Sequence, residues 1–337
     1  MKKYFQQGLI SLLLTSLLAA ATAVQAEELV VYSGRKDKFI TPLIKKFTAE
    51  TGIEVVLHTA KSTALLNKLR IEGDRTVADL YLSNDAGNLQ TGSRLGLFQP
   101  MDKKITNVIP ANLRAEDDTW VGLSARARVL VVNNNAKDLG FVKSVFDLAD
   151  PRLKDRLAIT HSSNGSFIAG VTVYNLSTST GEVTNWLKGM KENVGGNLFS
   201  KHSKIVKAVA SGKKDIGLVN HYYIYRHLAK NPDAPISILI PDQQSMGMGV
   251  AWNVAGIGIS KHTKKKALAE KLIQYFVSEQ GQQQFASVNN EYPTRVGVPA
   301  AAIVPAAGSY KVADVPMREL GTHRIETLDL LDAVGMP

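Results

Sequence analysis

Short apolar runs alternate with amphipathic stretches along the chain from residue 29 onward. The first run, 29–32, predicts a strand, and Thr41 then marks a helix start with Leu43 and Phe47 on the face that would meet a core. Gly52 ends that helix. The alternation continues with predicted strands at 53–57 and 78–82 and predicted helices at 63–72 and 88–94. This β-α-β-α-β order predicts a mostly parallel sheet with helices on its faces, and ligands bind such sheets at the carboxyl ends of the strands.

The same kind of pattern starts again after residue 128. Apolar runs that predict a further β-α series are found at 129–133, 157–160, 205–210 and 216–220. A long strand is predicted at 249–260, and a long amphipathic helix at 264–285 has Leu268 and Leu272 on its apolar side. The repeated β-α pattern and the length of the chain therefore predict two α/β lobes, each large enough to bury a core of its own.

The two predicted lobes are not separated by a low-complexity linker or an internal repeat. We expect the chain to cross between them more than once, so that the crossing segments form a hinge and the ligand cleft lies between the lobes. The crossings are predicted near 125–133 and 248–257. The lobes are assigned as discontinuous units, with lobe 1 formed by residues 27–125 and 255–300 and lobe 2 by residues 126–254 and 301–337.

The amino terminus has the features of a secretory signal peptide. Lys2 and Lys3 precede an apolar run at 9–21, and the small residues of AVQA end at Ala26. The run is shorter than the roughly 20 residues that a bilayer span requires. We therefore predict cleavage after Ala26, removal of residues 1–26 and export of the mature chain.

Composition narrows the chemistry that the chain can carry out. The absence of cysteine excludes thiol catalysis and cysteine metal sites, and it leaves stability to a packed core. The 40 Lys and Arg outnumber the 30 Asp and Glu, but these charges are spread along the chain without an RNA-binding aromatic motif, so we expect no nucleic-acid partner. The positive balance favours small anions or negatively charged complexes as ligands.

Short polar residues follow two of the predicted strands, at 33–36 and at 83–85. Both loops lie where a ligand would bind, although ordinary turn chemistry explains the same residues equally well. Ser33 and Lys36 also fit the S-x-x-K spacing of serine acyl-transfer sites, but the companion K-T-G sequence is missing. The chain has no GxSxG, P-loop or GxGxxG sequence either, so we predict a binding protein and not an enzyme.

Seven segments distributed over the chain resemble a single protein family. They are VVYSGRKDKF, FTAETGIEV, VADLYLSNDAGNL, GLSARARVLVVN, HSSNGSF, VNHYYIYRHL and EYPTRVGV. Together they are similar to the periplasmic ferric-iron-binding proteins of bacterial ABC importers. The resemblance implies a periplasmic solute-binding fold of two α/β lobes joined by hinge strands. It also implies a monomer that captures Fe³⁺ in the cleft and delivers this small inorganic ligand to an inner-membrane ABC permease.

The adjacent Tyr222 and Tyr223 carry the metal chemistry in this resemblance. Fe³⁺ is a hard ion that prefers anionic oxygen donors such as phenolate. In a regular strand the two rings would point to opposite faces, so both reach one metal only if the backbone turns after the strand at 216–220. Their other possible role is that of buried aromatic side chains near a helix start.

The other expected ligands match the family less closely. Asp85 is the expected carboxylate ligand, with Asp37 and Asn84 as substitutes. Lys36 stands where the family has a loop histidine, and a charged lysine cannot ligate a metal. The histidines show no zinc-site spacing. Two phenolates and one carboxylate leave the Fe³⁺ coordination sphere incomplete, so the resemblance predicts an added anion, carbonate or phosphate.

An anion cradle is predicted where a polar loop enters a helix. Its hydroxyl and backbone N–H groups come from Ser163, Asn164, Gly165 and Ser166. A plain helix cap is the other explanation of this loop. Asn220 resembles the family's anion-contacting asparagine, and Arg126, or in its place Arg128, would bind carbonate through the fork of a guanidinium group.

A binding protein of the same fold for phosphate, sulfate, thiamine or a polyamine is the alternative function. Such cargoes do not require two phenolates, and an aromatic pair would instead stack on thiamine or hold a polyamine cation. A coloured ferric complex would favour iron, whereas a colourless protein saturated by an organic ligand would favour the alternative.

Overall fold

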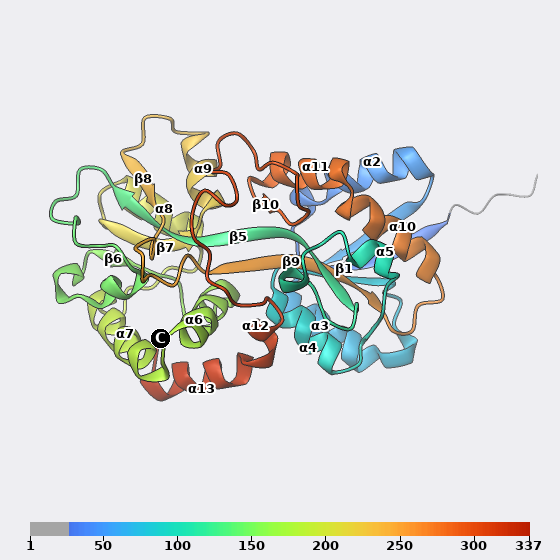
Figure 1. The fold of residues 1–337 in the computed structure, drawn as a ribbon, viewed down its shortest axis with the longest axis horizontal. Helices are drawn as coiled ribbons and strands as arrows, with labels where there is room; N and C mark the ends of the chain where they lie inside the picture. The colour runs from blue at the N-terminus through green and yellow to red at the C-terminus, as the bar shows by residue number, and fades with distance from the viewer. Residues whose placement is uncertain (1–26) are drawn as a thin grey trace, which may run out of the picture.

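A computed structural model describes residues 27–337 of the chain, and the predicted signal peptide at 1–26 lies outside the described residues. Two α/β lobes lie next to each other along the longest axis, which confirms the predicted fold class (Figure 1). The strands are β1 (Glu28–Ser33), β2 (Glu54–Thr59), β3 (Leu80–Ser83), β4 (Phe98–Gln99), β5 (Trp120–Asn133), β6 (Leu157–Ala158), β7 (Ile216–Asn220), β8 (Ile236–Leu239), β9 (Trp252–Ser260) and β10 (Tyr292–Pro293). The helices are α2 (Thr41–Thr51), α3 (Ser62–Glu72), α4 (Ala86–Arg94), α5 (Lys103–Thr106), α6 (Gly165–Ser177), α7 (Thr180–Val194), α8 (His202–Ala210), α9 (Tyr222–Leu228), α10 (Lys266–Val277), α11 (Glu279–Asn289), α12 (Glu319–Thr322) and α13 (Arg324–Val334).

The strands form a continuous sheet in the order β2-β1-β3-β9-β5-β7-β6. The strand β1 pairs in parallel with β2 and β3, as predicted for the first part of the chain. Beyond β3 the sheet is mixed: β9 pairs antiparallel with β3 and with β5, and β5 pairs antiparallel with β7 and β8, whereas β6 pairs in parallel with β7. The reason is that β5 and β9 traverse the molecule in opposite directions.

The long strand β5 connects the two lobes. Its residues 120–127 pair with β9, whereas residues 128–132 pair with β7. It therefore belongs to the sheet of one lobe in its first half and to that of the other lobe in its second half, and β9 runs beside it (Figure 1). The finer division of the chain into residue ranges for each lobe stays a prediction.

Two predicted elements differ from the structure in an instructive way. The single helix expected at 264–285 is broken into α10 and α11 at Ser278, whose backbone is extended and whose Oγ accepts a hydrogen bond from the Gly281 N–H at 3.1 Å. The serine thus acts as the N-cap of α11 and interrupts the hydrophobic periodicity that suggested one helix. The second difference is the strand predicted to start at residue 249, which starts at Trp252. The run 205–210 lies in α8, between the strands β6 and β7.

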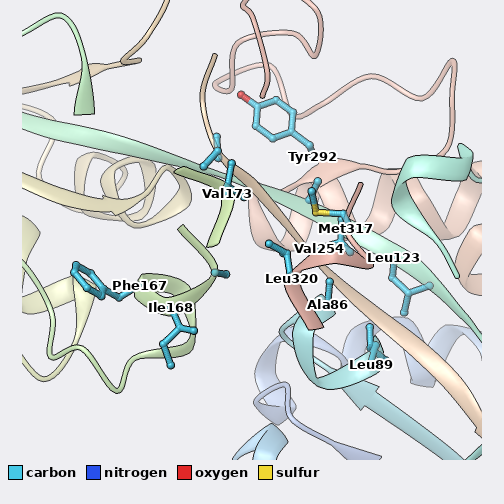
Figure 2. Close-up of a cluster of buried hydrophobic side chains, with 14 of the residues drawn as sticks. Ala86, Leu89, Leu123, Phe167, Ile168, Val173, Val254, Tyr292, Met317 and Leu320 are labelled. Carbon is cyan, nitrogen blue, oxygen red and sulfur yellow. The ribbon is translucent and has the colours of Figure 1, made fainter. Parts of the chain in front are cut away.

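The last helices of the chain pack on both lobes. The helix α12 packs against α4, and α13 packs against α6 and α7. Figure 2 shows the buried side chains that meet here, among them Ala86 and Leu89 of α4, Val254 of β9, Ile168 of α6 and Leu320 of α12. Within residues 27–337, no helix combines the length and the apolar character needed to cross a bilayer.

Candidate functional site

A polar cleft of about 550 Å³ is built from both lobes. One side is formed by the loops that follow β1 and β3 and by the first turn of α3, and the other side by the loop that enters α6 and by the start of α9. The nine residues predicted to bind a metal or an anion all line this cleft: Asp85, Arg126, Ser163, Asn164, Gly165, Ser166, Asn220, Tyr222 and Tyr223. The structure therefore brings together segments that are far apart in the sequence, while their roles stay predictions.

The tyrosine pair lies where β7 turns into α9. His221 separates the two elements, and its ring fixes the turn because Nδ1 accepts from the Ala127 N–H at 3.1 Å and Nε2 donates to the Asn290 carbonyl at 2.8 Å. Burial lowers the pKa of His221 to about 4, which keeps the ring neutral. Since α9 begins at Tyr222, the two neighbouring rings lie on the same side, with their centroids 4.4 Å apart and their planes at 35°.

The environment of the two phenol groups is only partly closed to solvent. Tyr222 is buried with 8% of its surface exposed, and Tyr223 is half-buried. The pKa of Tyr223 is raised, mainly by the neighbouring Tyr222 phenol and secondly by burial. Arg226, one helical turn after Tyr222, places its guanidinium 4.4 Å from the centre of the Tyr222 ring. A cation bound next to the Tyr223 oxygen would oppose this shift, because it favours the negatively charged phenolate.

The loop that enters α6 lies directly beside the tyrosines. Asn164 is the N-cap of α6, and its Oδ1 accepts a hydrogen bond from the Ser166 N–H at 3.0 Å. The Asn220 side chain connects the two segments, since its Nδ2 donates to Ser166 Oγ at 3.3 Å and to the Tyr222 hydroxyl at 3.4 Å. The start of an α-helix carries free N–H groups and a partial positive charge, so this loop suits an oxyanion.

Asp85 faces the cleft from the loop after β3, but both of its oxygens are already engaged. It caps α4 by accepting from the Gly87 N–H at 3.1 Å on Oδ1. Asn253 donates to the same oxygen at 3.1 Å, and Oδ2 accepts from Asn88 at 3.0 Å and from Arg324 at 3.3 Å. A metal can use this carboxylate only by replacing one of these donors.

The two substitutes proposed for Asp85 are placed differently. Asn84 lines the cleft, and its backbone and side-chain oxygens accept from Arg126 at 2.6 and 3.2 Å. Asp37 is exposed, accepts from Thr59 Oγ1 at 2.5 Å and lies outside the cleft lining. The structure thus separates Asp37 from the other predicted site residues.

Glu291 forms an ion-pair network at the base of the cleft that sequence analysis missed. Its Oε2 is 2.9 Å from Arg35 Nη2 and 2.5 Å from Ser124 Oγ, and its Oε1 is 3.5 Å from Arg126 Nε. Burial alone would raise the pKa of Glu291, but the charges of Arg35 and Arg126 and the hydrogen bonds from Arg35 and Ser124 outweigh it and lower the pKa to about 2. The carboxylate is therefore ionised and holds both guanidinium groups in place.

Comparison with known proteins gives the family of the chain. Residues 42–311 match the family model described as bacterial extracellular solute-binding protein. The chain belongs to this family. As a sequence, this solute-binding protein is 33% identical to iron uptake protein A1 of Synechocystis sp. over 327 residues, which cover 94% of this chain and 89% of that protein. It is 30% identical over 287 residues to the major ferric iron-binding protein of Neisseria meningitidis, covering 83% of this chain and 85% of that protein.

Solved structures agree with the sequence comparison. The solute-binding protein superposes on Trichodesmium FutA in complex with iron and citrate ligands with a TM-score of 0.83 and 31% identity, covering 92% of this chain and 100% of that one. These names confirm the resemblance to ferric-iron-binding proteins that the seven segments indicated. They describe proteins of binding and uptake, as the prediction of a binding protein requires.

The cleft of this solute-binding protein is strongly positive. Its basic side chains are Arg35, Lys36, Lys61, Arg126, Arg226 and Arg324. Among residues 27–337, two carboxylates line the same cleft, Asp85 and Glu291, and both are paired with arginine. Six basic groups against two acidic ones leave an excess of four positive charges, so the cleft favours a ligand that carries negative charge.

Some of these cleft residues left a signal in the sequence. Arg226 follows Tyr222 by four residues, which places both on one face of a helix, and Glu291 begins the segment EYPTRVGV. Lys61 and Arg324 gave no such signal, because each comes from a segment whose approach to the cleft depends on tertiary packing. In the part of the chain from 27 to 337, no group of three or more His, Asp or Glu side chains is arranged to hold a metal ion.

Proposed function

We propose that this protein is the periplasmic substrate-binding component of an ABC importer for ferric iron. It captures Fe³⁺ in the cleft with the phenolates of Tyr222 and Tyr223 and with an added anion, and it delivers the iron to an inner-membrane permease. The observation that carries the proposal is the pair of neighbouring phenol rings beside a helix N-terminus in a positive cleft. Fe³⁺ matches two phenolates better than any organic cargo does, because it is a hard ion with a high charge.

The anion has a defined place in this proposal. The loop Ser163–Ser166 and Asn220 supply donors on one side of the cleft, and Arg126 lies on its lining. Lys36 and Lys61 add positive charge from the opposite lobe, so the substitution of the family's loop histidine by Lys36 strengthens the demand for an anion. Carbonate and phosphate are the proposed anions, and the citrate in the Trichodesmium relative makes citrate a third probe.

Asp85 is the proposed carboxylate ligand under one condition. Asp85 Oδ2 accepts hydrogen bonds from Asn88 and from Arg324. Iron that binds this oxygen must replace one of the two donors. Arg324 is the donor that closure of the cleft would displace most easily, since it comes from α13 whereas Asn88 lies on the same helix that Asp85 caps.

Replacing both tyrosines by phenylalanine tests the proposal. The variant Tyr222→Phe/Tyr223→Phe keeps the ring area and removes both oxygens, so we expect the phenolate-to-iron charge-transfer absorption to vanish and the ferric affinity to fall by at least about a thousandfold. Tyr225→Phe is the matched control, because Tyr225 lies in the same helix and is buried but does not line the cleft.

Wild-type protein and the Tyr225→Phe control are titrated with Fe³⁺ in bicarbonate, phosphate or citrate, and circular dichroism verifies that each variant is folded. Unchanged iron binding in the double variant would refute the proposal. A colourless wild-type protein that is saturated by thiamine, a polyamine, sulfate or phosphate without iron would favour the alternative function.

A further inference from the structure

Arg128 is a buried cation behind the cleft. It lies in β5 at the first position that pairs with β7, opposite Asn220, and only 3% of its surface is exposed. It does not line the cleft, and within the part of the chain that the structure describes it has no carboxylate at ion-pair distance. Its Nε also lacks a hydrogen-bond partner among these residues. A buried charge without an ion-pair partner opposes folding. This cost suggests that the Arg128 guanidinium has a role in the neighbouring cleft.

The contact between Arg128 and Asn220 has only one possible polarity. Arg128 Nη1 is 3.2 Å from Asn220 Oδ1, and a guanidinium group can donate but not accept hydrogen bonds. The oxygen of the Asn220 amide must therefore face Arg128, and its NH₂ group must face the other way. On that side lie Ser166 Oγ at 3.3 Å and the Tyr222 hydroxyl at 3.4 Å.

His202 does not accept a hydrogen bond from Arg128. Its Nδ1 accepts from the backbone N–H of Asn220 at 3.1 Å, while its Nε2 is 3.3 Å from Arg128 Nη1. A neutral imidazole with an accepting Nδ1 carries its hydrogen on Nε2, so Nε2 cannot accept from Arg128. The same His202 holds the Asn220 backbone, which leaves the side-chain amide as the part that Arg128 orients.

We propose that Arg128 is a positioning residue that holds the Asn220 amide with its NH₂ group toward the cleft, so that the bound anion and the iron-bound oxygen of Tyr222 both meet a donor. This inference rests on the proposed function. Without Arg128 the amide is free to turn, and its oxygen would then face the anion and the phenolate as an acceptor, which repels both. The positive charge of Arg128 also favours negative charge on the cleft side of Asn220.

A double-mutant cycle with Asn220 tests the inference. Ferric affinity is measured at fixed bicarbonate by competition with a synthetic chelator for the wild type, Arg128→Met, Asn220→Ala and the double variant. We expect Arg128→Met to lower the affinity about tenfold in the wild type and less than about twofold in the Asn220→Ala background, because the route through the amide is already lost there. Arg128→Lys, which keeps a charged donor, should recover part of the loss.

The spectrum and a control variant separate positioning from a general loss of structure. Since the donor to Tyr222 is removed, the charge-transfer band of the Arg128→Met complex should shift relative to the wild type. Arg114→Met removes a guanidinium that is paired with Asp118 away from the cleft, and it should leave both band and affinity unchanged. If Arg128→Met does not fold, Arg128→Lys replaces it in the double-mutant cycle. Its loss of ferric affinity should be smaller and should again disappear in the Asn220→Ala background.

The outcomes are distinguishable. An equal loss in both Asn220 backgrounds, or no loss and no shift of the band in folded Arg128→Met, would overturn the inference while the iron-binding function stands. A wild-type protein that forms no coloured ferric complex would instead overturn the proposed function on which the inference rests.

Discussion

At the scale of single residues, Glu291 makes the stability of the fold dependent on pH. Its folded pKa of about 2 lies below the ordinary value of 4.5, so its contribution to stability is complete above pH 4.5 and is lost as the pH falls toward 2. Glu291→Gln leaves Arg35 and Arg126 without their shared carboxylate and should lower the free energy of unfolding at pH 7 by about 3–5 kcal/mol. Urea denaturation at pH 7 and pH 3 measures this difference, which should shrink at the lower pH.

The exposed ion pair between Arg318 and Glu116 provides the control for that prediction. Glu116 is largely exposed, so Glu116→Gln should leave the urea midpoint nearly unchanged at both pH values. A difference between Glu291→Gln and wild type that is the same at pH 7 and pH 3 would mean that the ionised carboxylate is not what stabilises the base of the cleft.

Single residues also show what sequence analysis can and cannot recognise. Tyr222 and Tyr223 are recognisable because their chemistry is visible in two adjacent letters. Glu291 is not, since its partners Arg35 and Ser124 are 256 and 167 positions away. Asp85 was recognised as a carboxylate in a promising loop, but the sequence does not show that four donors already occupy its oxygens.

At the scale of elements, the close contact between α12 and α4 depends on glycine. A Cβ atom on Gly321 would lie 2.6 Å from the Cβ of Gln90 and 2.7 Å from the carbonyl oxygen of Gly87. Gly321→Ala should therefore push α12 away from α4 and lower the free energy of unfolding by about 1–3 kcal/mol. Chemical denaturation of the apo protein measures the change.

A glycine of α7 is the matched control for this contact. A Cβ atom on Gly181 would meet nothing within 4 Å, and Gly181 lies in a helix, so Gly181→Ala should be neutral or slightly stabilising. Equal stability of Gly321→Ala and wild type would show that α12 can shift without loss and that it does not hold the lobes as the structure suggests.

Local patterns predicted many elements because their signals are local. The helix α2 ends at Gly52 in the left-handed conformation that its sequence indicated, and the strand at 216–220 has the predicted bounds. The break at Ser278 was missed because hydrophobic periodicity continues through it, although a serine followed by Glu279 is a typical helix start. The antiparallel direction of β9 depends on which strand it meets in space, and no local pattern shows that.

At the scale of the whole molecule, the sequence predicted two lobes and more than one crossing between them. The structure adds how they are joined, by the paired strands β5 and β9 and by the segment of α12 and α13 that packs on both sides (Figure 1). Two neighbouring strands bend together more easily than they slide, so the lobes are expected to move as a hinge. The six basic groups of the cleft oppose its closure until an anion and the metal–phenolate complex balance them.

Closure around iron is therefore the expected response to the complete ligand. Small-angle X-ray scattering should show a smaller radius of gyration when Fe³⁺ and bicarbonate are added together, in the wild type and in Tyr225→Phe, but not in Tyr222→Phe/Tyr223→Phe. At a free ligand concentration of 100 times Kd, binding should also stabilise the wild type by about 2.7 kcal/mol, which thermal unfolding measures. Bicarbonate alone should cause no contraction, because without Fe³⁺ no metal links the phenolates on one side of the cleft to the loop of Asp85 on the other. A wild-type protein that binds iron without contracting would show that the cleft is already closed before the metal arrives, and that iron enters it without movement of the β5 and β9 hinge.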